Sequence, residues 1–258
     1  MFGFLIKKAF FDTWDNFIPA ILVNLGFIAV LAIPMLLPQA LAGVSPIFGV
    51  IAFALGVLAL FIYAGGAMGV AKTIVNYQAP EWQTFTGALV AYLPVTITLG
   101  VLVALHAALL LVAVPVYSAM DNVAGLVAIA VLFWLSVIWW LSIQYVIPVR
   151  TRLADQIVPV FKKAFILSLD NTVFTAALAA GALVITGISF FTAFLIPGIT
   201  GLAVWYQAAL KLRIYKYDYL EENPGASRKR VPWDALLYEE RDRVGKRTLR
   251  GMIFPWKE

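Results

Sequence analysis

Long apolar runs separated by short polar segments make up most of this chain, from about residue 17 to about residue 210. Several of these runs reach about 20 residues, the length at which a helix crosses a hydrocarbon layer of roughly 30 Å. The pattern predicts an all-α polytopic membrane protein built as a six-transmembrane-helix bundle. We expect the six spans at about 17–37, 47–70, 85–116, 123–149, 172–187 and 191–210.

Two of the expected spans are longer than the usual 17–25 residues. The third and fourth are therefore expected to tilt, to kink at Pro94 or Pro115, or to protrude from the bilayer. The segment ISFFTAFLIPG, between the fifth and sixth spans, is itself apolar and gives no clear boundary. Together the spans define a transmembrane domain over residues 1–212, followed by a helical, basic, amphipathic cytoplasmic tail over residues 213–258.

The overall composition supports a lipid environment. The chain has 258 residues, of which 62% are hydrophobic and 13% are charged, and its mean hydropathy is +0.91. Soluble domains are about 45–50% apolar and about 25% charged. The chain contains no Cys, which excludes disulfides, thiolate metal sites and Cys nucleophiles.

The distribution of cations predicts the orientation in the membrane. With six spans, all 19 Lys and Arg residues fall on one side, and the three loops on the other side carry only Asp121 as a charge. Lys and Arg accumulate on the cytoplasmic side of membrane proteins. We therefore expect a multi-pass protein of the cell (inner/cytoplasmic) membrane, with both termini in the cytoplasm and an even number of crossings.

A ten-residue motif occurs twice. KKAFFDTWDN begins at Lys7, and KKAFILSLDN begins at Lys162, 155 residues later. Each copy precedes a span, which predicts a short helix lying in the cytoplasmic interface with its lysines on anionic lipid head groups. The residues assigned to this anchoring and capping role are Lys7, Lys8, Asp15, Asn16, Lys162, Lys163, Asp170 and Asn171.

Two interpretations of Asp15 and Asp170 remain. As intramembrane carboxylates they could lie on an ion or proton path. As residues at a helix start, Asp and Asn could instead cap the first turn of the span, and their position near the cytoplasmic boundary favours capping.

A weaker echo, EWQTFTGALVAYLPV, precedes the third span and suggests three parallel helical hairpins as pseudo-repeats.

Several segments together resemble the YesL-type family of bacterial integral membrane proteins. They are DTWDNFIPAILVNLGFIAVLAIPML, YAGGAMGVAK, EWQTFTGALVAYLP, FKKAFILSLDNTVFTAAL and LIPGITGLAVWYQAALK. The resemblance covers about residues 1–215. It implies a six-helix bundle and an accessory role beside carbohydrate ABC importers, and it supplies no catalytic or ligand residues.

Few polar side chains lie inside the expected spans. His106 is the only histidine, and it has neither a second His or Cys for a metal site nor an obvious acidic partner for proton relay. We interpret it, with Asn24 and Gln144, as an intramembrane polar site that joins helices by hydrogen bonds.

Hydrolase and phosphate-loop motifs are absent, so we expect no enzyme and no cofactor. Gly65 and Gly69 form a GxxxG packing face.

The tail mixes twelve Lys and Arg with eight Asp and Glu from residue 211 onward, which is weak evidence for nucleic acid. Its helix should continue to the NPG at 223–225, and PWDALLYEERDRV predicts a short amphipathic helix that ends at Gly245. Docking, either onto the protein's own bundle or onto a partner, is assigned to Arg228, Lys229, Arg230, Trp233, Phe254 and Trp256.

Two functions follow from these features. The first is a non-enzymatic membrane scaffold or accessory subunit, with an ABC importer as a possible partner. The alternative is a small-solute or ion transporter or channel, which would need Asn24, Thr96, Thr98, His106, Gln144 and Asp170 to line one cavity.

Overall fold

The computed structural model describes residues 1–228, 231–245 and 247, and in this part of the chain every regular element is a helix. The helices are α1 (Phe2–Asp15), α2 (Phe17–Ala42), α3 (Pro46–Val75), α4 (Trp82–Ser118), α5 (Val123–Ile143), α6 (Val146–Arg152), α7 (Ile157–Asp170), α8 (Thr172–Phe191), α9 (Gly198–Glu222), α10 (Trp233–Leu236) and α11 (Tyr238–Val244).

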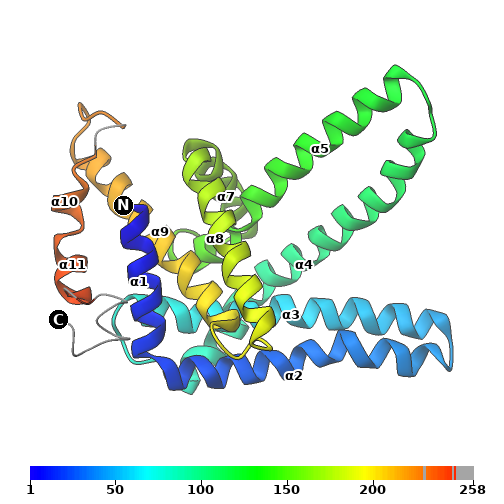
Figure 1. The fold of residues 1–258 in the computed structure, drawn as a ribbon, viewed down its shortest axis with the longest axis horizontal. Coiled ribbons are helices and arrows are strands. Elements are labelled where there is room, and N and C mark those ends of the chain that lie inside the picture. Colours follow the sequence, from blue (N-terminus) through cyan, green and yellow to red (C-terminus); the bar gives the residue numbers. More distant parts are fainter. Residues whose placement is uncertain (229–230, 246, 248–258) are drawn as a thin grey trace.

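Two long helical pairs project from the part of the molecule that holds both ends of the described chain. Figure 1 shows the α2–α3 pair and the α4–α5 pair extending to the right with their tips apart, while α1, α9 and α11 lie together on the left. Both tips are short turns, 43–45 and 119–122, and neither contains a Lys or Arg. The first turn is shorter than its Pro-rich sequence suggests, because Pro38 still lies within α2.

Five helical segments are long and apolar enough to cross a membrane: Phe17–Ala42, Pro46–Val75, Trp82–Ser118, Val123–Arg152 and Thr172–Phe191. They confirm a helical, multi-pass membrane protein. The expected sixth span, 191–210, is not among them. Its first residues form a turn, and the helix that follows begins at Gly198 and continues through a polar stretch to Glu222.

The repeated motif has the same structure in both copies. A 14-residue helix, α1 or α7, ends at an Asp, a single Asn follows, and a long helix begins at the next residue. The two Asn residues share a backbone conformation, with φ −113° and ψ 37° at Asn16 and φ −131° and ψ 41° at Asn171. Each amide donates to the carbonyl four residues earlier, at Asp12 or Leu167.

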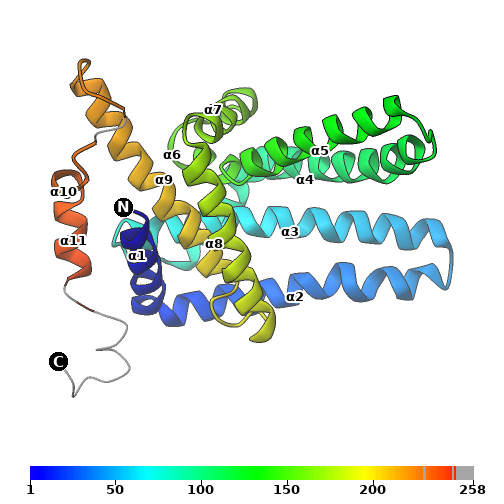
Figure 2. The same ribbon diagram turned by 45° about the horizontal axis from the view of Figure 1, so that its top comes forward.

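The echo before the third span does not form a third copy. No separate helix precedes α4, which begins directly at Trp82 after a capping box formed by Glu81 and Thr84. The short helices instead pack on other elements: α1 lies against α9, and α7 lies against α5 and α6 (Figure 2). Two junctions, rather than three, therefore share this design.

The buried core lies where the helices converge and not along the projecting pairs. The fully buried apolar side chains include Leu5, Val75, Val146, Leu210 and Leu212. The projecting parts of α2 to α5 expose large apolar side chains instead, among them Leu36, Val50, Leu111, Leu126 and Trp134. Protein packing therefore holds one end of the molecule together, and the rest of the long helices needs lipid around it.

The expected GxxxG face is a packing face. A Cβ atom at Gly65 would lie 2.9 Å from the Thr96 side chain, and one at Gly69 would lie 2.2 Å from the Ala88 Cβ. Both neighbours belong to α4, so the two glycines allow α3 and α4 to approach closely, as small residues do between membrane helices.

Replacement of Gly69 by Leu should separate α3 from α4 and lower the free energy of unfolding by about 1–3 kcal/mol, the usual cost of overpacking. Thermal unfolding in one lipid or detergent would measure the change. Gly87→Leu is the matched control, because nothing lies within 4 Å of a Cβ at Gly87 on the same helix pair. Equal destabilisation by the two variants would contradict a specific contact at Gly69.

Candidate functional site

The densest group of buried polar side chains lies between α1, the C-terminal end of α3, α9 and α11. It contains Lys8, Asp12, Tyr77, Lys211, Tyr215 and Glu240. Local spacing explains how the helices supply these residues. Lys8 and Asp12 lie four residues apart on α1, as do Lys211 and Tyr215 on α9, so each pair shares one helix face.

The Glu240 carboxylate is the centre of this cluster. Its Oε2 atom lies 2.9 Å from Lys8 Nζ and accepts a 2.6 Å hydrogen bond from the Tyr77 hydroxyl. Its Oε1 atom lies 2.6 Å from Lys211 Nζ and accepts a 2.8 Å hydrogen bond from the Tyr215 hydroxyl. Four donors from three separate parts of the chain therefore hold one carboxylate on α11.

The lysines of the cluster have further partners. Lys8 has no exposed surface, and its Nζ atom lies 2.9 Å from the Asp12 carboxylate and 2.7 Å from the Tyr77 hydroxyl oxygen. It also lies 3.9 Å from the centroid of the Tyr77 ring. Lys211 donates to the Val75 carbonyl over 3.0 Å. Buried cations require such a complete set of partners, because an unpaired buried charge is expensive.

Burial and charge act in opposite directions on the two acids. Burial raises the pKa of Glu240, but the hydrogen bond from Lys211 and the positive charge of Lys8 outweigh it and lower that pKa to about 2. For Asp12 burial dominates, and Lys8 offsets it only in part, so the pKa rises to about 6. Glu240 is thus the acid that the cluster stabilises as a carboxylate.

A second polar layer lies next to the first. Gln207, one turn before Lys211 on α9, accepts from Arg152 Nε over 2.7 Å and donates to the Thr151 hydroxyl over 2.8 Å. Arg152 also donates to the Asn76 side chain over 3.2 Å. Because Asn76 precedes Tyr77, the two layers join at the end of α3 and tie α6 to α9.

The repeated Asp residues both bind arginines that follow α9. Arg247 donates to the two oxygens of Asp15 over 2.8 and 2.9 Å. Arg228 donates to Asp170 over 3.1 Å, and the hydroxyl of Tyr217 donates to the same carboxylate over 2.6 Å. The hydrogen bond from Tyr217 and the nearby cations lower the pKa of Asp170 despite partial burial.

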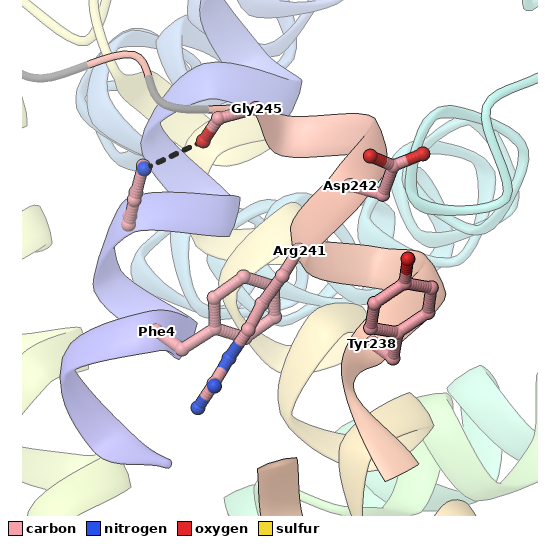
Figure 3. Close-up of a pocket in the computed structure, with 6 residues that line it drawn as sticks. Phe4, Tyr238, Arg241, Asp242 and Gly245 are labelled. Atoms are coloured by element: carbon pink, nitrogen blue, oxygen red, sulfur yellow. Dashed lines mark hydrogen bonds between the residues drawn. The ribbon is translucent and has the colours of Figure 1, made fainter. Parts of the chain in front are cut away.

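A pocket of about 480 Å³ separates part of α11 from α1. Figure 3 shows Phe4 on one side and Tyr238, Arg241, Asp242 and Gly245 on the other. Lys7 closes one edge by donating to the Gly245 carbonyl over 2.9 Å. We call residues 233–245 the strap, since they lie across the bundle and are held by Glu240, by Gly245 and by the buried side chains of Leu237 and Val244.

The structure differs from the expected role of the motif lysines. Lys8 is buried under the strap and is therefore unavailable to lipid phosphates, and Lys7 is partly buried beside Gly245. In the second copy, Lys162 and Lys163 are exposed, and Lys163 donates to the Leu153 carbonyl over 2.6 Å. Only the second pair faces outward as a lipid anchor would.

The expected side-chain caps are also absent from the two junctions. Asn16 and Asn171 occupy the N-cap positions of α2 and α8, but neither side chain accepts a hydrogen bond from the helix that follows. Their amides point back to the preceding helix, and Asp15 and Asp170 face arginines. The sequence spacing predicted the junctions correctly. The Asn side chains, however, bond to the helix before each junction, and the Asp side chains bind arginines that follow α9.

The three polar residues of the expected intramembrane site lie apart. Asn24 contacts the turn between α8 and α9, donating to Leu195 and Pro197 carbonyls. His106 lies against the rings of Trp139 and Trp140, with centroid distances of 5.9 and 6.0 Å. Gln144 donates to the Leu141 and Thr175 carbonyls. Each one connects a different set of neighbours, so they do not form a common site.

The predicted tail helix is present but divided at Leu237 into α10 and α11, and it ends at Gly245 as expected. Trp233 packs on the core, 5.8 Å from the Arg213 guanidinium carbon. Arg228 docks onto Asp170. Lys229, Arg230, Phe254 and Trp256 lie outside the described residues.

Sequence reasoning missed Glu240, Lys211, Tyr77 and Tyr215. One signal was available: Gln207, Lys211 and Tyr215 recur every four residues, which places a polar stripe on a single face of α9. The contribution of α11 could not be found in this way, because its partner Lys8 is 232 residues away in the sequence.

Replacement of Glu240 by Gln should release the strap. Loss of this carboxylate leaves Lys8 and Lys211 short of a counter-charge in a buried site, a change that costs on the order of 3–5 kcal/mol. The chain has no Cys, so Leu237→Cys provides a single thiol that the docked strap buries. We expect its maleimide labelling to accelerate at least tenfold when Glu240→Gln is added.

Asp12→Asn in the same Leu237→Cys background is the matched control. Asp12 also contacts Lys8, but burial already disfavours its charge, so labelling should change less than twofold. Equal acceleration by the two substitutions would mean that the Glu240 carboxylate does not hold the strap.

The strap should stay docked between pH 8 and pH 5. Glu240 has a pKa of about 2 in the folded protein and 4.5 as a reference, so its contribution is complete above pH 4.5 and is lost as the pH falls towards 2. Asp12 has the opposite sign, since a raised pKa makes the folded state bind its proton more tightly below about pH 6. Spin labels at positions 3 and 239 would report the distance, and separation already between pH 7 and pH 5 would contradict control by Glu240.

The described residues contain no group of three or more acidic or histidine side chains placed to hold a metal ion. No family model, no curated protein and no solved structure matches the chain.

Proposed function

We propose that the protein is a non-enzymatic membrane scaffold or accessory subunit whose strap controls a docking surface on the cytoplasmic side. The observation that carries this proposal is the way in which four donors converge on the Glu240 carboxylate. The polar side chains of the described residues are concentrated at one end of the bundle, where they hold a segment that is distant in sequence. Such an arrangement suits assembly better than passage of a solute.

The docking surface would be the basic site under the strap. Without Glu240, the cluster presents Lys8 and Lys211 together with two phenol hydroxyls, and Asp12 is its remaining acid. Charge complementarity across interfaces favours partners of opposite sign. An acidic side chain from a partner protein could thus replace Glu240, exchanging an internal contact for an intermolecular one.

The cation distribution supports the orientation that this function needs. All 19 Lys and Arg residues lie outside the turns 43–45, 119–122 and 192–197. By the positive-inside tendency, the strap and both termini face the cytoplasm. The resemblance to the YesL-type family makes a carbohydrate ABC importer the partner to test first.

Transport by the protein alone has less support. Asn24, His106 and Gln144 contact different neighbours, Thr96 and Thr98 bond to carbonyls within their own helix, and Asp170 binds Arg228. A transporter needs such groups to converge on one hydrated path.

Comparison of native membrane complexes would test the proposal. Full-length protein would be crosslinked and purified as wild type, Glu240→Gln and Asp12→Asn, at matched expression. We expect a discrete complex of fixed stoichiometry. Its yield should rise at least threefold in Glu240→Gln, because the strap no longer competes for the basic site, and should stay constant in Asp12→Asn. Absence of a stoichiometric partner in all three samples would contradict a scaffold.

A second measurement separates the two functions. Purified protein in liposomes should give no flux of ions or small sugars above empty liposomes. A flux that His106→Leu or Gln144→Leu abolishes would favour the transporter and overturn the proposal.

A further inference from the structure

We propose that α8 and α9 form a re-entrant hairpin, which enters the membrane from the cationic side, turns inside the hydrocarbon and leaves by the same side. This differs from the expected pair of crossings at 172–187 and 191–210. Three independent observations carry the inference: the depth of the turn, the solvent that the neighbouring helices require, and the way in which the turn satisfies its own backbone.

The depth of the turn follows from its contacts with α2. Asn24 bonds to Leu195, Pro197 and Thr200, and the Thr200 hydroxyl donates to the Ala20 carbonyl over 3.3 Å. Asn24 is only the eighth residue of α2, which continues for 18 more residues to Ala42. At about 1.5 Å per residue, the end of α2 lies about 27 Å beyond the turn.

The contacts of α3 give the same depth. The Tyr63 hydroxyl donates to the Val23 carbonyl over 2.7 Å, so Tyr63 lies at the level of Asn24. From there α3 extends back over 17 residues to Pro46, which is about 26 Å of helix. The hydrocarbon layer is roughly 30 Å thick, so the 192–197 turn and the 43–45 turn cannot both lie at the outer surface.

The segments beyond the level of Asn24 need lipid. Residues 25–62 contain no charged side chain. Several of their large apolar side chains are exposed in the structure, with fractions of 66% at Leu36, 69% at Ile47 and 69% at Val50. The hydrocarbon therefore extends along this part of α2 and α3. It also continues past the level of Asn24, because Leu22 and Ile18 expose 64% and 71% of their surface, so the 192–197 turn lies inside it.

Both ends of the hairpin lie on the cationic side. α8 begins two residues after Asp170, which binds Arg228 and Lys216, and α9 passes Lys211 in the Glu240 cluster on its way to Glu222. Figure 2 shows the hairpin turning beside α2, well short of the α2–α3 tip. Entry and exit on one side therefore agree with the charges at its two ends.

The turn also has the backbone chemistry that a lipid environment requires. Asn24 Nδ2 donates to the Leu195 and Pro197 carbonyls over 2.8 and 2.9 Å, and Asn24 Oδ1 accepts from the Thr200 N–H over 2.9 Å. Ser189 Oγ accepts from the Gly198 N–H over 3.0 Å. A turn at the water surface would find these partners in solvent, whereas irregular backbone in hydrocarbon needs them from protein.

The residues of the turn fit the same setting. Phe190 and Phe191 expose 71% and 89% of their surface, and Ile196 exposes 42%. Asn24 itself exposes 1%. Gly198 has φ +61°, and a Cβ there would lie 2.4 Å from the Asn24 side chain, so only glycine allows this close approach. An apolar exterior around a satisfied polar centre is the arrangement expected inside a bilayer.

Cysteine accessibility in intact cells would test the hairpin, because the chain has no Cys. Ala193→Cys reports the turn, Val44→Cys and Asp121→Cys report the two outer turns, and Asp155→Cys reports the cationic side. With a membrane-impermeant maleimide added outside, we expect positions 44 and 121 to react and positions 193 and 155 to stay unlabelled. Labelling of position 193 at the rate of position 44 would overturn the proposal.

A depth measurement turns the expected lack of labelling into a positive signal. A small fluorophore on the thiol at position 193 of the full chain in vesicles should be quenched at least twofold more by nitroxides in the middle of the acyl chain than by nitroxides at the head group. Position 44 should show the reverse order. The same order at both positions would exclude a turn inside the hydrocarbon. Neither result depends on the strap or on a partner.

Discussion

In hydrocarbon, every polar group has to find its partner within the protein, and this constraint determines the structure. Most of the chain meets this requirement with helices that carry almost no polar side chains. Most of the polar side chains that remain lie where the helices converge. There α1, the polar face of α9 and the strap satisfy one another through Lys8, Lys211 and Glu240. The same requirement explains Asn24, which supplies the hydrogen bonds that water would give to an exposed turn.

The Glu240 cluster shows why a buried ion group can hold a distant segment without being a large source of stability. Removing a carboxylate or ammonium from water costs several kcal/mol, and the attraction between them recovers this only with good geometry and a complete set of hydrogen bonds. Glu240 receives four, from donors that are themselves fixed by α1, α3 and α9. The arrangement therefore favours one position of the strap, because any displacement removes the only acid that pairs with Lys211 in the cluster and leaves Lys8 with Asp12 alone.

The sequence predicted the elements that local chemistry determines. Apolar runs located α2, α3, α4 and α5 because lipid leaves few other structures, and the repeated motif located the α1–α2 and α7–α8 junctions. It did not predict the burial of Lys8, since the covering residue lies in a segment that no local pattern connects to α1. Hydropathy also could not distinguish a helix that crosses the membrane from a hairpin that enters it and turns back. The turn at 192–197 is as apolar as a span, and only its contacts with Asn24 fix its depth.

The duplication of the KKAF motif can be understood from what its two copies share in space. In both, an Asn side chain closes the end of a short helix, and the preceding Asp accepts an arginine from the chain that follows α9. The lysines do not share a role, because the first pair lies under the strap and the second is exposed. What repeats is thus a junction with an acceptor for the tail, at Asp15 and at Asp170. The tail binds both copies, through Arg247 and Arg228. A change in the position of the tail would therefore alter the contacts at both junctions together.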